Sequence, residues 1–320
     1  MPENPSPPSN LKKWIVAARP WALPASTMPV LYGTTLAFVV GNSRFSLFRF
    51  VLALAGMVLL HSAANMLSDI FDFKRGLDKE ITPASGALVR GWLAPARLAG
   101  ASAVLFIAGI AVGLVLVKLT GALLLIWIGA AGVAVGASYT FLKARALGDL
   151  AVFFNFGILG ALGAYLVQKP YFSWIPVIWT VPMALLVMAI LHANNWRDIL
   201  SDRERKITTV AALLGDAGSL IYYGFLIFGP FAIILGLIIV PRIVAPIYEP
   251  MPWPSAAVLA ALPQASGLWK RARRRHSPFH PMDFILLDGA TARFNLVFGL
   301  ILTASLWVQY LLETKFYWVY

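Results

Sequence analysis

Long apolar stretches separated by short polar connections make up almost the whole chain. Most of them approach or exceed the roughly 20 residues that a helix needs to cross a bilayer, and none shows the apolar–polar alternation of a barrel strand. The pattern therefore predicts an all-α, polytopic membrane protein with about nine transmembrane helices. The predicted spans are residues 22–41, 49–68, 98–117, 121–141, 148–167, 174–193, 219–240, 254–269 and 294–312. The eighth span is short and contains two prolines, Pro254 and Pro263.

Composition narrows the class further. Of the 320 residues, 59% are hydrophobic and only 12% are charged, whereas a soluble domain has about 45–50% apolar and 25% charged residues. A soluble enzyme and a disordered protein are both excluded on this ground. We expect the polar, proline-rich residues 1–10 to form a disordered tail and residues 11–320 to form a single transmembrane domain. The absence of cysteine excludes disulfides, thiolate metal sites and cysteine nucleophiles.

The basic residues predict the orientation in the membrane. With nine spans, the N-terminus and every second connection lie on one side, and that side carries 20 of the 26 Lys and Arg residues. Such an excess marks the cytoplasmic face, so we expect a cytoplasmic N-terminus and an external C-terminus in the cell (inner) membrane. The same excess accounts for the net charge of +12 without a nucleic-acid partner.

Polar side chains gather on one face where the second span ends. Asn65, Asp69 and Asp72 are spaced at steps of four and three residues, which places them on one side of a helix. The stretch begins inside the apolar run and ends in basic residues. Carboxylates near hydrocarbon cost several kcal/mol unless they are paired or face a wet cavity, so we expect this face to line a cavity.

The sixth span ends in the same way. Asn195, Asp198 and Asp202 are spaced at steps of three and four residues, which again favours one helix face. Both faces lie at the predicted cytoplasmic surface. The cost of keeping their carboxylates near hydrocarbon is lowest if both faces point into one shared pocket. One acidic loop by itself is as well explained by solvated loop charges and helix caps; two such faces, each preceded by Asn, favour a common site.

Two clusters of like charge repel each other, so a cation is expected between them. Oxygen ligands without cysteine suit Mg²⁺, which keeps several waters and bridges substrate phosphates. Basic residues beside the acids match the oxygens of a diphosphate. They are Lys74, Arg75, Arg197, Arg203 and Lys206. The mixture at a membrane-embedded mouth favours a phosphorylated, lipid-soluble substrate.

These motifs resemble those of the UbiA superfamily of intramembrane prenyltransferases. The resemblance rests on Asn65-x3-Asp69-x2-Asp72 with Asp78, and on Asn195-x2-Asp198-x3-Asp202. Arg19-Pro20, Tyr139-Thr140, Lys143, Gly148-Asp149, Gly157 and Ala292-Arg293 also fit, so the similarity covers the chain from about Trp14 to about residue 310. Its details look most like the branch that prenylates 1,4-dihydroxy-2-naphthoate in menaquinone synthesis.

The resemblance implies nine helices around a lipid-open cavity that holds Mg²⁺ and a polyprenyl diphosphate. It implies metal or diphosphate binding by Asn65, Asp69, Asp72, Asp198 and Asp202, with help from Asp78 and Asn195. Lys143, Arg203 and Lys206 would contact the diphosphate, Tyr139 would lie near the reacting carbon, and Arg19 would bind a carboxylate of the aromatic acceptor. The implied reaction transfers a polyprenyl group to that acceptor.

Several alternatives stay open on the sequence alone. The acceptor could be 4-hydroxybenzoate, homogentisate, a tetrapyrrole or an isoprenoid alcohol instead of the naphthoate. A secondary transporter also uses intramembrane acids, but these tend to lie at the midplane, whereas the acids here lie at one surface among bases. His61 and His192 precede the acidic faces, and we interpret both as hydrogen-bonded interior residues. Asp288 to Arg293 matches half of a CDP-alcohol phosphotransferase signature without its later acids, which we interpret as coincidence.

Overall fold

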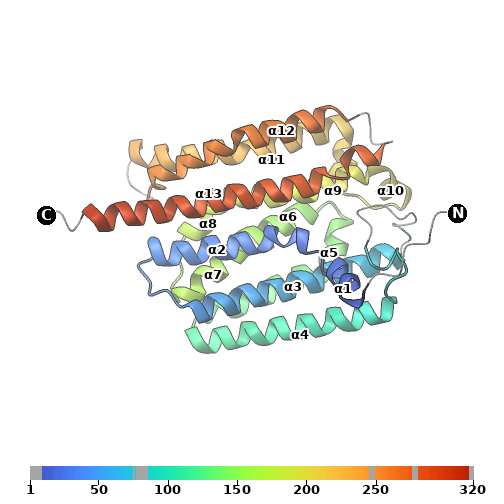
Figure 1. The fold of residues 1–320 in the computed structure, drawn as a ribbon, viewed down its shortest axis with the longest axis horizontal. Coiled ribbons are helices and arrows are strands. Elements are labelled where there is room, and N and C mark those ends of the chain that lie inside the picture. Colours follow the sequence, from blue (N-terminus) through green and yellow to red (C-terminus); the bar gives the residue numbers. More distant parts are fainter. Residues whose placement is uncertain (1–8, 75, 77–85, 245–248, 276–279, 317–320) are drawn as a thin grey trace.

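The structure is a computed structural model that describes residues 9–74, 76, 86–244, 249–275 and 280–316. All regular elements in these ranges are helices. In chain order they are α1 (Asn10–Ala18), η1 (Pro20–Ala22), α2 (Pro24–Val39), α3 (Leu47–Lys74), α4 (Pro95–Thr120), α5 (Leu124–Lys143), α6 (Gly148–Val152), η2 (Phe153–Leu159), α7 (Gly160–Gln168), α8 (Ile175–Trp179), α9 (Val181–Arg197), α10 (Ile199–Glu204), α11 (Val210–Ile243), η3 (Trp253–Ala261), α12 (Leu262–Arg273), η4 (Pro281–Phe284) and α13 (Leu287–Phe316). The long helices run side by side as one bundle (Figure 1).

The predicted all-α membrane fold is confirmed, but the number of spans is not. Within the described ranges, seven helices are long and apolar enough to cross a membrane, or eight if the bent segment from α1 to α2 counts as one span. Every predicted apolar run coincides with helix. The weak eighth run, 254–269, is covered by η3 and α12, which pack against α11 and α13. This run is not among the helices that are long and apolar enough to cross a membrane.

The predicted tail and the first span differ in detail from the structure. Residues 1–8 of the predicted tail lie outside the described residues, and Asn10 already begins α1. The first span bends by 57° between the α1–η1 segment and α2. Arg19, in the left-handed conformation, ends α1, and Pro20 follows it. The break in the span lies at Leu23, which precedes Pro24. A helix rarely continues through the residue before a proline, so the sequence contains a signal for this bend.

Burial divides the bundle into an inner and an outer set of helices. The core is built largely on α2, α9, α11 and α13, with Tyr32, Trp196 and Tyr223 among its largest fully buried side chains. By contrast α4 and α5 expose large apolar residues such as Ile107 and Trp127, which suits helices that face lipid. The bundle therefore presents hydrocarbon-compatible surface on the outside of α4 and α5.

Close contacts between helices depend on glycine. A Cβ atom at Gly157 would lie 2.3 Å from the Cβ of Ala184 on α9, and one at Gly33 of α2 would lie 2.1 Å from the carbonyl oxygen of Ala161 on α7. Small residues let membrane helices approach this closely, because hydrocarbon gives them no hydrophobic drive to associate. Gly157 belongs to η2, a π-helical segment that joins α6 to α7.

The two acidic helix ends lie at the same end of the bundle. In Figure 1 the C-terminal end of α3 and the short helix α10 both lie toward the N-terminus of the chain, opposite its C-terminus. The first predicted helix face is confirmed, since Asn65, Asp69 and Asp72 all belong to α3. The second prediction was wrong in one respect. Helix α9 ends at Arg197, and Asp198 adopts a non-helical turn before α10. The amide of Asp198 donates to the carbonyl oxygen of Asn195, three residues earlier (3.2 Å), whereas an α-helical amide bonds to the fourth residue before it.

Candidate active site

A cavity opens between the acidic ends of α3 and α9. It encloses about 1100 Å³, its open mouth included. Five of the predicted site residues line it: Arg19, Asn65, Asp72, Tyr139 and Lys143. The sequence therefore predicted five of the ten polar side chains that line this cavity.

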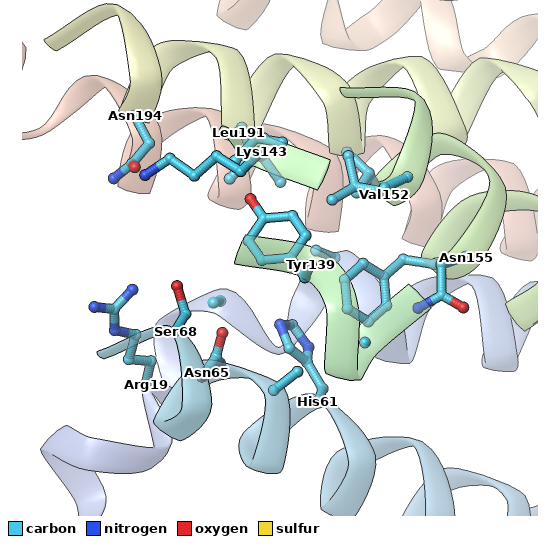
Figure 2. Close-up of a pocket in the computed structure, with 18 of the residues that line it drawn as sticks. Arg19, His61, Asn65, Ser68, Tyr139, Lys143, Val152, Asn155, Leu191 and Asn194 are labelled. Atoms are coloured by element: carbon cyan, nitrogen blue, oxygen red, sulfur yellow. The ribbon is translucent and has the colours of Figure 1, made fainter. Parts of the chain in front are cut away.

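The polar side chains face one another across this cavity. Figure 2 shows Arg19, Asn65 and Ser68 on one side and Lys143 with Asn194 on the other, with the Tyr139 ring between them. The first group comes from the α1–η1 junction and α3, the second from the ends of α5 and α9. Segments far apart in the sequence thus contribute opposite walls of one polar space.

The first acidic motif is held by the bend at the start of the chain. Asp69 is buried, with 4% of its surface exposed, and the guanidinium of Arg19 pairs with its carboxylate. Asn65 donates to the carbonyl oxygen of Ala18 (3.4 Å). Asp72, one turn further on, lines the cavity itself. The side chain of Arg19 and the carbonyl group of Ala18, at the left-handed turn that ends α1, therefore both contact α3.

The second acidic motif has one paired and one buried carboxylate. Both oxygens of Asp198 accept from Arg197, at 2.9 and 3.2 Å. Asp202 is 1% exposed and accepts from Thr209 at 3.5 Å. Burial raises the pKa of Asp202 to about 6; the charges of Asp198 and Asp72 act in the same direction, whereas Lys143 and Thr209 act against them. Asp202 is thus a carboxyl group whose charge depends on its neighbours.

Lys143 connects the two motifs. This buried residue ends α5, and its ammonium group interacts electrostatically with Asp72 of the first motif and with Asp198 and Asp202 of the second. Asp72 also acts on Asp202 directly. Carboxylates from helix ends more than 120 residues apart in sequence therefore share one electrostatic environment, with a fixed cation among them.

The donor set suits a hard divalent cation that keeps part of its hydration shell. Within the described ranges, no three acidic or histidine side chains converge closely enough to hold an ion by themselves. Mg²⁺ takes one or two carboxylates and fills its other positions with water and phosphate oxygens. Among the described residues, the buried Asn195 has a side-chain oxygen, Oδ1, without a hydrogen-bond partner. Asp72, Asp198, Asp202 and Asn195 are therefore fitting oxygen donors for Mg²⁺ and its bound water.

The residues that line the cavity do not include six of the predicted ones: Asp69, Asp198, Asp202, Asn195, Arg203 and Lys206. Arg203 and Lys206 are exposed, and Arg203 donates to the carbonyl oxygen of Ala212 (2.9 Å). Asn195 is buried, with 1% of its surface exposed. Asp78 lies outside the described residues. The binding roles of these residues stay predictions.

The structure adds residues that the sequence analysis did not assign to the site. Asp288 lines the cavity from the start of α13, although half of a motif for another family had made it look incidental. Asn194 and Asn155 also line the cavity. Sequence spacing could not place Asp288, which is about 90 residues from its contacts in the cavity wall. Its position before the last apolar run was the only signal available.

The two histidines are hydrogen-bonded, as interpreted from the sequence. Nδ1 of His61 lies 2.7 Å from the hydroxyl of Ser26, and the His61 ring lies against Phe156. Nε2 of His192 lies 3.3 Å from the carbonyl oxygen of Ser219. His61 lines the cavity whereas His192 lies within the core, at 0% exposure.

An apolar cavity continues from the polar one. It encloses about 920 Å³ between α3, α4, α5 and α7, and glycines line much of its wall. Ala64, Gly136, Asn155 and Phe156 line both cavities. A polar chamber at one end and an apolar extension between helices suit a ligand with a charged head and a hydrocarbon tail.

Comparison with known proteins agrees with this arrangement. The sequence pattern described as the UbiA prenyltransferase family matches residues 26–287. A UbiA prenyltransferase domain-containing protein 1 homolog of Drosophila melanogaster is 33% identical over 305 residues, which cover 91% of this chain and 78% of the fly protein. The human UbiA prenyltransferase domain-containing protein 1 is 31% identical over 299 residues, or 90% of this chain and 81% of the human protein.

Solved structures support the same fold. A UbiA homolog from Aeropyrum pernix K1 has a TM-score of 0.63 at 17% identity, covering 89% of this chain and 97% of that one. A UbiA homolog from Archaeoglobus fulgidus, solved bound to GPP and Mg²⁺, has a TM-score of 0.58 at 13% identity, covering 89% and 99%. Because the family's sequence pattern matches most of its length, the chain belongs to the UbiA prenyltransferase family.

Proposed function

We propose that the protein transfers a polyprenyl group from a polyprenyl diphosphate to an aromatic acceptor, with Mg²⁺ at the diphosphate. The observation that carries this proposal is the electrostatic environment that Asp72 and Lys143, which line the polar cavity, share with Asp198 and Asp202. The Archaeoglobus relative, which binds GPP and Mg²⁺, supports the same pair of ligands here.

The residues of this chain have distinct tasks in the proposed reaction. Asp72, Asp198 and Asp202 would hold Mg²⁺, which supplies positive charge to the departing diphosphate when bound. Lys143 adds a fixed cation beside the same group as the allylic C–O bond breaks and its electron pair leaves with the diphosphate. The apolar walls exclude water from the allylic cation, and the face of Tyr139 offers it a cation–π contact of about 0.5–2 kcal/mol.

Carbon–carbon bond formation then completes the transfer. The π electrons of the electron-rich acceptor ring form the new bond to the allylic carbon. The ring becomes aromatic again by losing a proton, or carbon dioxide when a carboxylate occupies that position. We infer 1,4-dihydroxy-2-naphthoate as the first acceptor to test, because the motifs resemble that branch. The relatives named above do not favour it over 4-hydroxybenzoate, homogentisate, a tetrapyrrole or an isoprenoid alcohol.

Replacing a motif carboxylate tests the proposal. Purified protein with a radiolabelled prenyl diphosphate and each acceptor in turn should release diphosphate and form a prenylated product only when Mg²⁺ is present. In Asp69→Ala and Asp198→Ala we expect the rate to fall by about 10²-fold or more, the effect of removing one well-placed electrostatic group. Glu313→Gln, at the opposite end of the bundle, is the matched control and should keep its rate.

A folded Asp198→Ala variant with the wild-type rate would rule out the site. If the wild type transfers nothing to any acceptor but moves an ion across a vesicle membrane, the protein is a transporter instead. Folding of each variant is checked by its elution volume and melting temperature in detergent.

A further inference from the structure

A carboxylate outside both acidic motifs faces the cavity. Asp288, at the start of α13, lines the cavity together with Gly289 and Ala292, and 23% of its side chain is exposed. Its Oδ1 accepts from the amide of Gly289 (2.7 Å), and its Oδ2 accepts from Arg197 (3.0 Å) and Asn194 (3.4 Å). Three donors from two helices therefore fix the orientation of this carboxylate.

Arg197 couples this carboxylate to the second acidic motif. Its Nη1 donates to Asp288 while its Nε and Nη2 donate to Asp198. Because the planar guanidinium is rigid, the two carboxylates are held in a fixed relation to each other. Asn194 also points into the cavity beside Lys143 (Figure 2). Asp288 and Asn194 therefore form one section of the cavity wall, and Arg197 is hydrogen-bonded to Asp288 there.

The chemistry of Asp288 limits what it can bind. An ionised carboxylate only accepts hydrogen bonds, and a diphosphate bound to a divalent cation has no proton to donate. A direct contact with the diphosphate would therefore be repulsive. A ring hydroxyl donates a hydrogen bond, and such charge-assisted bonds are about twice as strong as neutral ones. Of the two substrates, the hydroxylated acceptor is the one that suits this section of the wall.

We propose that Asp288 binds the acceptor by taking a hydrogen bond from its ring hydroxyl, and that Arg197 and Asn194 are positioning residues for that carboxylate. This inference rests on the proposed prenyl transfer. As the ring carbon attacks, positive charge spreads to the hydroxyl oxygen and the hydroxyl becomes more acidic. The hydrogen bond to Asp288 therefore strengthens in the transition state, which is the condition for an interaction to accelerate a reaction.

The test compares a hydroxylated ligand with one that lacks the hydroxyls. The probes are 1,4-dihydroxynaphthalene as acceptor and 1,4-dimethoxynaphthalene as a competitive inhibitor. In Asp288→Ala we expect kcat/KM for the diol to fall by about tenfold or more, as for the loss of a hydrogen bond to a charged group. The inhibition constant of the dimethyl ether and the KM for the prenyl diphosphate should stay within about twofold of wild type.

The chain offers a closely matched control. Asp216 is also paired with a largely buried arginine, Arg275, at 2.6 Å, and 34% of its side chain is exposed, but it does not line the cavity. Asp216→Asn should leave all three constants unchanged. Arg197→Met, by contrast, should raise the KM of both substrates, because Arg197 orients Asp288 and Asp198 together. Partial recovery of both values in Arg197→Lys would support a positioning role.

The outcomes separate the inference from the proposed function. Wild-type protein that transfers no prenyl group to any hydroxylated aromatic acceptor would overturn both. Wild-type transfer with an unchanged diol kcat/KM in Asp288→Ala would overturn the inference alone, and so would an equal loss for the diol and the ether. If Asp288→Ala does not fold, Asp288→Asn keeps the shape of the side chain and must show the same selective loss.

Discussion

At the scale of single residues, each motif carboxylate has its own electrostatic setting. Asp198 is paired with its sequence neighbour Arg197, a contact that the sequence makes easy to anticipate. Asp69 is paired with Arg19, fifty residues away, and no spacing rule predicts that contact. The sequence grouped these acids as one predicted site. It could not assign their partners, because the partners depend on how α1 packs against α3.

The raised pKa of Asp202 predicts pH-dependent Mg²⁺ binding. Metal binding requires the ionised carboxylate, and burial raises the pKa of Asp202 to about 6. Mg²⁺ affinity should therefore be nearly constant above pH 7 and fall by up to about tenfold for each pH unit below 6. Titration calorimetry of the protein without prenyl diphosphate, at pH 5, 6 and 7, measures this dependence.

The raised pKa of Asp202 also makes the stability of the folded protein depend on pH. A carboxyl whose pKa is raised by folding binds more protons in the folded state between about pH 4 and 6, so without Mg²⁺ stability should decrease as pH rises through that window. The stabilisation by Mg²⁺ should appear as the carboxyl ionises. Asp202→Asn removes the titrating group and should flatten both profiles. Unchanged profiles in that variant would show that another group is responsible.

At the scale of helices, the apolar runs predicted the elements well and their interruptions poorly. Every predicted span coincides with helix because a helix satisfies the backbone hydrogen bonds of a long apolar segment within the segment itself. The turn at Asp198 and the π-helical segment η2 depend on contacts with neighbouring helices, which local periodicity does not record. The extra residue of a π-helical turn and the glycine at 157 together let η2 approach α9.

A methyl group at Gly157 should destabilise the bundle. The added Cβ would lie 2.3 Å from the Cβ of Ala184, so η2 and α9 must separate, at a cost of about 1–3 kcal/mol. We expect Gly157→Ala to lower the melting temperature in detergent. Gly236→Ala in α11 is the control: its new methyl meets nothing within 4 Å, and alanine favours helix by up to about 1 kcal/mol. Equal melting temperatures for the two variants would contradict this account.

At the scale of the whole molecule, charge and topology agree with each other. The predicted cytoplasmic connections and the two acidic helix ends lie at the same end of the bundle (Figure 1). The sequence anticipated that the acidic ends meet, because a carboxylate near hydrocarbon needs a polar counterpart. It could not anticipate that α13 contributes Asp288 to the same cavity, since α13 carries one acid there and no repeated motif.

Cysteine labelling tests the orientation. The chain has no cysteine, so single substitutions need no altered background. In intact cells, a maleimide that does not cross membranes should label Phe172→Cys, in the connection between α7 and α8, and should label Arg274→Cys, after α12, only once the membrane is made permeable. Both native side chains are exposed. The reverse pattern would invert the topology, and labelling of both from outside would disprove it.

The glycine-lined apolar cavity has a practical consequence for the study of this enzyme. It continues directly from the polar chamber through Ala64, Gly136, Asn155 and Phe156, and an alkyl chain of any origin fits such a space. Surfactants with long unbranched tails are therefore expected to behave as inhibitors, and kinetic constants will vary with the solubilising agent. Reconstitution into lipid nanodiscs, where bilayer lipid replaces the micelle, provides the conditions under which different donors can be ranked.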